Sequence, residues 1–257
     1  MTRLSVILIT QDESADIRAC LDSVRWADEI VVVDGGSRDD TIAICREYTD
    51  KVYVSEDWPG FGPQKNHALG YATGEWILSL DADERVSPAL RHEIEQAMAS
   101  GRFDAYEIPR LSTYCGRTLR HGGWWPDHVL RLFKREQGRF SNHRVHERVL
   151  VTGRCGRLQE PLIHHSFRSL EEVLEKINCY STESARMLHE QDRQGGLWAA
   201  LGHGLWAFVR TYFLKAGLLD GREGLMLAIS TAEGTYYRYL KLTYLKHQAD
   251  NPGPPRE

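Results

Sequence analysis

Two aspartates two positions apart are the first residues of this sequence that could do chemistry. Residues 77–88 read ILSLDADERVSP, so Asp81 and Asp83 directly follow an apolar run that predicts a buried strand. Like charges held this close repel one another unless a cation lies between them or water solvates both. Carboxylate oxygens favour Mg²⁺ or Mn²⁺, which complete their shells with water and substrate phosphates. The pair therefore predicts a metal site; the alternative is a solvated acidic turn before the helix whose start Ser87 and Pro88 indicate.

A third carboxylate follows another predicted strand. In VVVDGGSRDDT, Asp34 stands at the carboxyl end of a strand, where open α/β sheets bind ligands, and Gly35 and Gly36 allow a ligand to approach the backbone closely. The alternative is an ordinary strand-to-helix turn capped by Asp and Ser side chains. Neither acidic segment is a P-loop or a GxGxxG fingerprint, so kinase and dehydrogenase chemistry lack their expected residues.

A parallel sheet is needed to bring these strand ends together, and the first hundred residues predict one. Strand and helix patterns alternate there, and the continuous Val/Ile runs are typical of strands covered on both faces. The expected strands are 4–9, 29–34, 51–55 and 75–81. We expect helices at 17–24, at 40–48, after a Gly- and Pro-rich loop at 58–66, and from 88 onward.

The rest of the chain predicts a short β-rich stretch and then helices. YEIPRL, HVLRLFKR and RVHERVLV read as short strands, whereas Val173, Leu174, Ile177 and Tyr180 fall on one face of a helix. We therefore expect an α/β catalytic domain at 1–168, divided into a donor and metal half (1–101) and an acceptor half (102–168). A helical extension at 169–250 and a flexible tail at 251–257 complete the expected organisation.

Composition limits the class of protein and its setting. The N-terminal MTRLSVILITQDE has a short apolar run and no small-residue cleavage site, which predicts a strand and not a secretory signal. The five cysteines form no CxxC pair, which argues against a zinc site or a disulfide framework and favours a reducing, cytoplasmic setting. Residues 1–101 carry 9 Lys and Arg against 19 Asp and Glu, whereas residues 102–157 carry 12 against 5, so the two segments are expected to face different partners.

Several motifs together resemble a known family. LSVILITQDE, VVVDGGSRDDT, the QKN of GPQKNHALGYATGEW, and LSLDADE occur in the order and spacing of the family-2 inverting glycosyltransferases, which have the GT-A fold. GGWWPDHVLRLFKR, RVHERV, PLIHHSF and FLKAGLLDGREGL resemble the branch with the lipopolysaccharide core β-1,4-glucosyltransferases. The resemblance implies a Rossmann-like nucleotide-sugar-binding sheet with helices on both faces, UDP-glucose as the donor of a hexose, and a Mg²⁺ or Mn²⁺ cofactor.

The resemblance also implies residue roles. Thr10, Glu13 and Asp34 match residues that line the base and ribose, and Lys65 matches a basic residue that lies towards the diphosphate. Asp81 and Asp83 match the metal motif, with Asp83 the more direct ligand, and His164 is a further candidate contact to the metal or diphosphate; the alternative for His164 is a buried structural histidine. The family commonly has Asn at the position of Asp12, so Asp12 is left out of the expected donor site.

An inverting transfer also needs a base for the acceptor hydroxyl. Glu147 in RVHERV is the first candidate and Asp127 in WWPDH the second; the alternatives are a salt-bridged strand carboxylate and a turn residue after Pro126. Arginine suits phosphate and carboxylate recognition, so the basic segment is expected to bind an anionic acceptor. The arginines concerned are Arg117, Arg120, Arg131, Arg144 and Arg148; alternatively they pair with acids of the protein itself.

Residues 197–219 read superficially as a membrane span. His203, Arg210 and Lys215 interrupt the stretch, and aromatic residues mixed with basic ones suit a helix at a bilayer surface, or one packed on the catalytic domain. We expect peripheral association with the cytoplasmic face of the inner membrane, where the lipopolysaccharide core is made.

The sequence thus predicts a metal-dependent hexosyltransferase that acts on an anionic glycolipid. Its expected partners are a nucleotide sugar, the acceptor and a membrane surface, with no nucleic acid. The alternatives are a polyprenyl-phosphate glycosyltransferase, which would need no carboxylate base, and a non-catalytic sugar-nucleotide or glycan-binding module. A nucleotidyltransferase should have a Gly-rich basic loop after its first strand, where this chain has TQDES.

Overall fold

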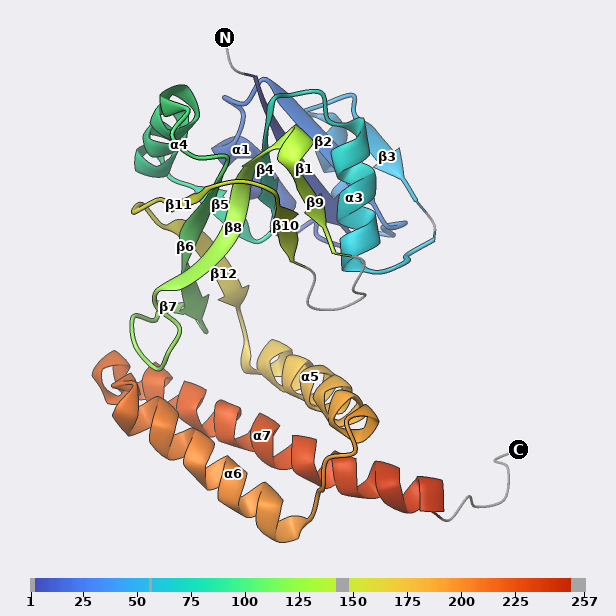
Figure 1. Ribbon diagram of the computed structural model, residues 1–257, viewed down its shortest axis with the longest axis vertical. Helices are drawn as coiled ribbons and strands as arrows, with labels where there is room; N and C mark the ends of the chain where they lie inside the picture. The colour runs from blue at the N-terminus through green and yellow to red at the C-terminus, as the bar shows by residue number, and fades with distance from the viewer. Residues whose placement is uncertain (1–2, 56, 142–147, 251–257) are drawn as a thin grey trace. The chain divides into compact units, whose positions relative to one another are not determined.

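The computed structural model describes residues 3–55, 57–141 and 148–250, and the chain divides into two compact units (Figure 1). The first unit comprises residues 1–111 and 127–164 and carries most of the sheet. The second comprises residues 112–126 and 165–257 and is mainly helical. Residues 112–126 thus belong to the helical unit, although the sequence analysis had placed them in the acceptor half of the catalytic domain.

The main sheet lies largely in the first unit and is mixed, with ten strands: the order is β3-β2-β1-β4-β8-β6-β12-β5, and β7 and β11 pair with β6. β1, β2, β3 and β4 run parallel, as the Val/Ile-rich runs predicted, whereas β8 is antiparallel to both β4 and β6. The strands are β1 Leu4–Thr10, β2 Glu29–Asp34, β3 Val52–Val54, β4 Trp76–Leu80, β5 Glu84–Val86, β6 Ala105–Tyr114, β7 Arg117–Thr118, β8 Asp127–Lys134, β11 Cys155–Arg157 and β12 Leu162–Phe167. A separate two-stranded sheet pairs β9 (Gly138–Phe140) with β10 (Val149–Val151).

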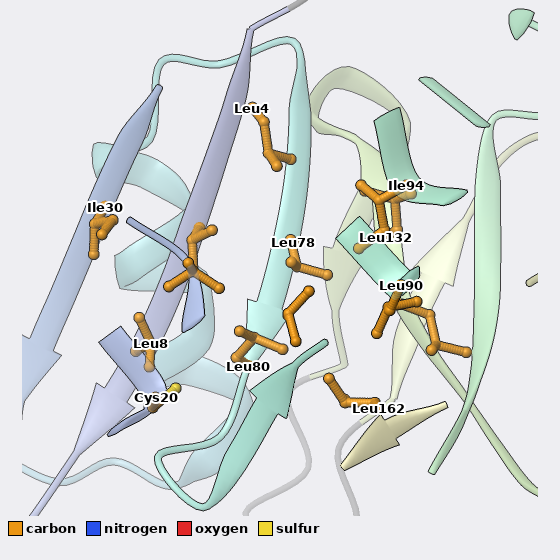
Figure 2. Close-up of a cluster of buried hydrophobic side chains, with 14 of the residues drawn as sticks. Leu4, Leu8, Cys20, Ile30, Leu78, Leu80, Leu90, Ile94, Leu132 and Leu162 are labelled. Carbon is orange, nitrogen blue, oxygen red and sulfur yellow. The ribbon is translucent and has the colours of Figure 1, made fainter. Parts of the chain in front are cut away.

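Helices cover both faces of this sheet, because alternate residues of each buried strand point to opposite sides. Leu4 and Leu8 of β1 pack in one apolar cluster with α1 (Ile17–Ser23) and α4 (Pro88–Ser100), and Figure 2 shows its members (Leu78, Leu90 and Ile94 among them). Ile7 and Ile9 of the same strand pack in a second cluster with Ala68 of α3 (Phe61–Tyr71). The sheet is therefore packed on both faces, and this packing positions its strand ends relative to one another.

Parallel pairing places the expected site residues at one edge of the sheet. β1 pairs with β2 so that Thr10 lies opposite Asp34, and it pairs with β4 so that Leu8 lies opposite Leu80. The turn after β4 then begins with Asp81. The carboxyl ends of β1, β2 and β4 meet here, as the sequence predicted.

Two local expectations need correction. Residues 61–66 were expected in a loop but form the first turns of α3, because Pro63 lies in the first helical turn, where it costs no hydrogen bond, and Gly60 precedes it with φ 121°. Residues 84–86 were expected to lead straight into a helix but form β5, which pairs with β12 before α4 begins. The α4 start itself is confirmed, since the Ser87 hydroxyl accepts a hydrogen bond from the Leu90 N–H at 3.1 Å and Pro88 follows it.

The second unit is a helical assembly in which α5 and α6 both pack on α7 (Figure 1). Its helices are α5 Leu170–Glu190, α6 Leu197–Val209 and α7 Gly221–Asp250; a π-helical turn at Arg210–Leu214 and a 3₁₀ turn at Gly217–Asp220 join α6 to α7. The prediction that Val173, Leu174, Ile177 and Tyr180 share the inner face of α5 is partly wrong. Val173 is buried, but Leu174 and Tyr180 are 54% and 51% exposed. Among the described helices, none combines the length and the apolar character needed to cross a bilayer.

Candidate functional site

Asp34 organises the turn that follows β2. Its carboxylate accepts hydrogen bonds from the Thr10 hydroxyl at 2.8 Å and from the Ser37 hydroxyl at 2.6 Å. The backbone N–H groups of Gly36 and Ser37 donate to it at 2.9 and 2.7 Å. Because Asp34 is fully buried and bonded in this way, it fixes the shape of the turn.

A cavity of about 580 Å³ lies beside this turn, within the size range of small-molecule sites. Its lining includes Gly35 and Gly36. A Cβ on Gly35 would lie 2.5 Å from the Trp58 ring, so the ring can pack this close to the backbone only because residue 35 is glycine. Asp12, which the sequence analysis had left out, also lines the cavity. Asp12 has φ 56°, and its carboxylate accepts a hydrogen bond from the Arg38 N–H at 2.7 Å.

The other two expected nucleotide contacts lie next to the cavity. Thr10 is almost wholly buried beneath Asp34, and the Glu13 N–H donates to the Thr41 hydroxyl at 2.8 Å. Of the described residues, the cavity lining comprises Gln11, Asp12, Gly35, Gly36, Ser37, Arg38, Ile42 and Val54.

Asp81 lies between two cations. Lys65 of α3 donates from Nζ to Asp81 Oδ1 at 2.9 Å, and Arg131 of β8 donates to Asp81 Oδ2. Burial favours a raised pKa for Asp81, but the charges of Arg131 and then Lys65 hold the pKa well below its usual range. Both of its oxygens therefore already have cationic partners.

Glu84 is the fourth member of this charged cluster. It is fully buried, and Arg131 donates to its Oε1 at 2.6 Å while the Asp81 N–H donates to its Oε2 at 3.0 Å. Burial raises the pKa of Glu84 despite the charge of Arg131. One arginine thus holds two carboxylates of the acidic turn together.

Asp83 points away from that cluster, to His164 of β12. The distance from His164 Nε2 to Asp83 Oδ2 is 3.2 Å, and β12 brings the histidine there by pairing His164 with Glu84. The other carboxylate oxygen, Asp83 Oδ1, is buried and has no hydrogen-bond partner in the described part of the chain. A buried carboxylate oxygen without a partner is unusual, and a water molecule, an ion or a ligand would satisfy it.

These residues fit a Mg²⁺ or Mn²⁺ site that is completed from outside the protein. Asp83 supplies an oxygen without a partner and His164 an imidazole nitrogen, both suitable ligands for such ions. Across residues 3–55, 57–141 and 148–250, no group of three or more His, Cys, Asp or Glu side chains is arranged to hold a metal by itself. Water and phosphate oxygens of a bound nucleotide would have to provide the remaining ligands.

Of the two candidate bases, only Asp127 lies in the described residues. It begins β8, its side chain is 43% exposed, and the Arg110 Nε donates to it at 2.9 Å. Arg110 also lies 3.8 Å from Glu84, so alternating charges link Asp127 to the acidic turn. Glu147 and Arg144 fall outside the described residues.

The expectation that the five arginines face an anionic acceptor is wrong for Arg131, which is only 7% exposed and pairs with Asp81 and Glu84. Arg117 pairs with Glu223 at 3.3 Å, but its side chain is 51% exposed, so its part in acceptor binding stays a prediction. Arg120 and Arg148 remain exposed.

Comparison with known proteins identifies the family to which this chain belongs. A family model described as glycosyl transferase family 2 matches residues 5–158, a range that contains Asp34, Asp81 and Asp83. The chain belongs to this family.

Relatives extend the likeness over the whole chain. An uncharacterized glycosyltransferase of Rickettsia prowazekii is 30% identical over 264 residues, covering 98% of this chain and 90% of that protein. The lipopolysaccharide core biosynthesis glycosyltransferase LpsC of Rhizobium meliloti is 29% identical over 255 residues, covering 92% of this chain and 93% of LpsC. The crystal structure of S. aureus TarS 1–349 superposes with a TM-score of 0.50 at 17% identity, over 96% of this chain and 92% of that one. The likeness to TarS confirms the GT-A fold.

The sequence analysis assigned Arg131 to acceptor binding and gave Glu84 no role of its own, so it missed the ion pair between them. The signal for Arg131 was present, because an arginine in the middle of the apolar strand HVLRLFK points inward only when a buried acid meets it. That acid is Glu84, the last carboxylate of the DADE run. The run therefore holds an internal ion-pair cluster as well as a candidate metal ligand.

Proposed function

We propose that the protein transfers a hexose, glucose, from UDP-glucose to a lipopolysaccharide inner-core acceptor, with inversion at the anomeric carbon. The observation that carries the proposal is the meeting of two features at one sheet edge. The cavity beside Asp34 suits a nucleoside, and Asp83 with His164 suits a diphosphate-bound cation. TarS, which shares the fold, has been crystallised with UDP and with UDP-GlcNAc.

The donor end would rest on residues with distinct tasks. Asp12 and the glycine turn after Asp34 would border the base and ribose, with Thr10 and Glu13 supporting them. Asp83 and His164 would hold Mg²⁺ or Mn²⁺, which when bound neutralises charge on the departing diphosphate. Lys65, whose Nζ lies 2.9 Å from Asp81, would lie close to the same phosphates. Asp81 would act mainly by holding Lys65 and Arg131 in place.

The acceptor end requires a carboxylate that can take a proton. Glu147 remains our first candidate. Asp127 is second because Arg110 already donates two hydrogen bonds to its Oδ2, so accepting a proton would weaken that pair.

The acceptor assignment rests on the relative LpsC and on the helical unit. Large apolar side chains on α6 and the turns after it lie open to solvent, and Trp198 is 83% exposed. The other members of this α6 face are Leu197, Leu201, Leu205, Trp206, Phe213, Leu214, Leu218 and Leu219, and Arg210 and Lys215 are exposed among them. An apolar face with basic residues suits the surface of an anionic membrane, where a glycolipid acceptor lies.

A transfer assay tests this function. The full chain is incubated with Mn²⁺, one of several radiolabelled nucleotide sugars, and either a phosphorylated lipopolysaccharide core acceptor or a polyprenyl phosphate. We expect glucose transfer from UDP-glucose to the core acceptor. The rate should fall as salt rises, because the Debye length shortens to about 8 Å at physiological ionic strength and the attraction between arginines and acceptor is screened. Transfer to the polyprenyl phosphate alone would replace the proposed acceptor, and donor binding without any transfer would favour a binding module.

A further inference from the structure

The helical unit contains a cavity of about 250 Å³ that the proposed transfer reaction does not use. It lies between α5 and α7, and all of its lining residues belong to the second unit. One end is aromatic, since Tyr114, Trp124 and Phe167 pack with ring centroids 5.7 to 5.8 Å apart. Val173, Ile177 and Leu227 continue this wall, so the cavity offers mainly apolar surface.

The hydroxyl groups of the lining are largely engaged within the protein. The Tyr114 and Ser230 hydroxyls bond to one another at 2.8 Å, and the Thr231 hydroxyl donates to the Leu227 carbonyl at 2.8 Å. Ser181 accepts a hydrogen bond from Lys241 at 2.9 Å. A sugar or nucleoside would find few free partners here, whereas a hydrocarbon would need none.

Two cations, Lys176 and Arg238, line the cavity, and no acidic residue does so within the described residues. Lys176 lies over the Phe167 ring at 4.8 Å and donates to the Ser166 carbonyl at 3.3 Å. Arg238 Nε is buried and has no hydrogen-bond partner in the described chain. A buried guanidinium N–H without a partner is costly, and an anion is the ligand that would satisfy it.

We propose that this cavity binds the hydrocarbon chain of an anionic amphiphile whose phosphate or carboxylate pairs with Arg238. Its volume exceeds the ~150 Å³ of an engineered apolar cavity that binds benzene, and lies below the ~300 Å³ typical of the smallest drug-sized sites. That size suits part of one alkyl chain. The inference does not depend on the identity of the donor or acceptor, because every residue it uses lies outside the donor site.

Calorimetric titration of the full chain with dodecyl phosphate, kept below its micelle concentration, tests the ligand class. We expect one molecule bound per chain, with dodecanol and inorganic phosphate at least about tenfold weaker because each lacks one half of the recognition. Laurate distinguishes the source of the anion: binding as tight as that of dodecyl phosphate means that the site accepts fatty carboxylates as well as alkyl phosphates. Equal binding of dodecanol or of inorganic phosphate, or no binding of dodecyl phosphate, would overturn the proposal.

Paired variants locate the ligand. Arg238→Gln should weaken dodecyl phosphate binding about 10- to 100-fold, whereas Arg186→Gln, which removes an exposed arginine of α5, should leave it unchanged. A Cβ on Gly234 would lie 3.7 Å from Ile177 Cγ2, so Gly234→Ala fits and Gly234→Leu fills the cavity. Gly202→Leu is the matched control, because nothing lies within 4 Å of a Cβ there.

Loss of binding in Gly234→Leu and Arg238→Gln, with the controls unaffected, is the expected result. Thermal unfolding of each variant shows whether it has folded, and Gly234→Ala provides a milder steric change should the leucine variant fail to fold. Unchanged binding in Arg238→Gln, together with unchanged binding in Gly234→Leu where that variant folds, would place the amphiphile elsewhere.

Discussion

Arg131 joins Asp81 and Glu84, the two carboxylates that shape the acidic turn at the proposed donor site. Removing one partner of a buried ion pair leaves an uncompensated charge, and Glu84 is fully buried. Arg110 lies 3.8 Å from Glu84 and would compensate in part. The arginine that the sequence analysis assigned to acceptor binding is therefore expected to matter first for stability.

Arg131→Met should lower the free energy of unfolding by ~3 kcal/mol, the lower end of the range for a broken buried pair. Arg131→Lys keeps one positive charge and should cost clearly less. Urea unfolding of the two variants and the wild type gives the comparison. A methionine variant as stable as the wild type would mean that the cluster contributes nothing to the fold.

The two candidate bases are separated by turnover. Glu147→Gln should lower turnover about 10²- to 10⁴-fold with donor affinity preserved, as expected for loss of a general base. Asp127→Asn should lower turnover less, because this change mainly removes the ion pair with Arg110. The reverse order of effects would transfer the role of base to Asp127.

At the scale of elements, Glu29 ties β1, β2 and the loop before β4 together. The Ser5 hydroxyl and the Lys51 ammonium both donate to its carboxylate, and the Thr73 N–H and hydroxyl donate to it at 2.7 and 2.9 Å. Burial favours a raised pKa, but the hydrogen bonds from Lys51, Ser5 and Thr73 lower the pKa of Glu29 from 4.5 to about 2.

This shift predicts a pH dependence of stability. A carboxylate whose pKa is depressed in the folded state stabilises that state above its unfolded pKa, and this contribution is lost as pH falls from about 4.5 towards 2. The loss should be on the order of 2–3 kcal/mol. Urea unfolding at pH 6 and pH 3 should show a smaller pH effect for Glu29→Gln than for the wild type. Glu75→Gln, which changes an exposed carboxylate, should keep the wild-type profile.

The sequence predicted the elements that its local pattern determines. The Val/Ile runs of β1 and β2, the Ser87-Pro88 start of α4 and the position of Asp34 at a strand end can all be read from a few neighbouring residues. It did not predict contacts made across the sheet, such as Arg131 with Glu84. It also did not predict that α3 begins at Phe61, because glycine and proline in that segment favour a loop unless the apolar Ala68 is buried against the sheet.

At the scale of the whole molecule, the α6 face is expected to hold the enzyme near its acceptor. Burying a large apolar side chain contributes about 1.5–3 kcal/mol, so the loss of two tryptophans should have a large effect on membrane affinity. Because Trp198 and Trp206 are 83% and 56% exposed, their replacement should disturb the fold little.

Trp198→Asp with Trp206→Asp should weaken binding to phosphatidylglycerol vesicles by at least about 100-fold. Leu174→Asp is the control, since Leu174 is an exposed apolar residue of α5 outside the α6 face. Vesicle co-sedimentation at low and physiological salt measures both the apolar and the electrostatic contributions. If the double variant sediments with vesicles as the wild type does, the α6 face is not the membrane contact.

The central claim is that Asp83 holds a cation on which donor binding depends, and calorimetric titration with UDP in Mn²⁺ or in EDTA tests it most directly. Wild-type protein should bind UDP with Mn²⁺ and should gain about 2.7 kcal/mol of stability at 100 times the Kd. With Asp83→Ala the Mn²⁺-dependent binding should disappear while the thermal unfolding of the free protein is retained, and Asp50→Ala, a change in an exposed turn, should behave as the wild type. UDP affinity that is the same in Mn²⁺ and EDTA, or undiminished in Asp83→Ala, would contradict the account.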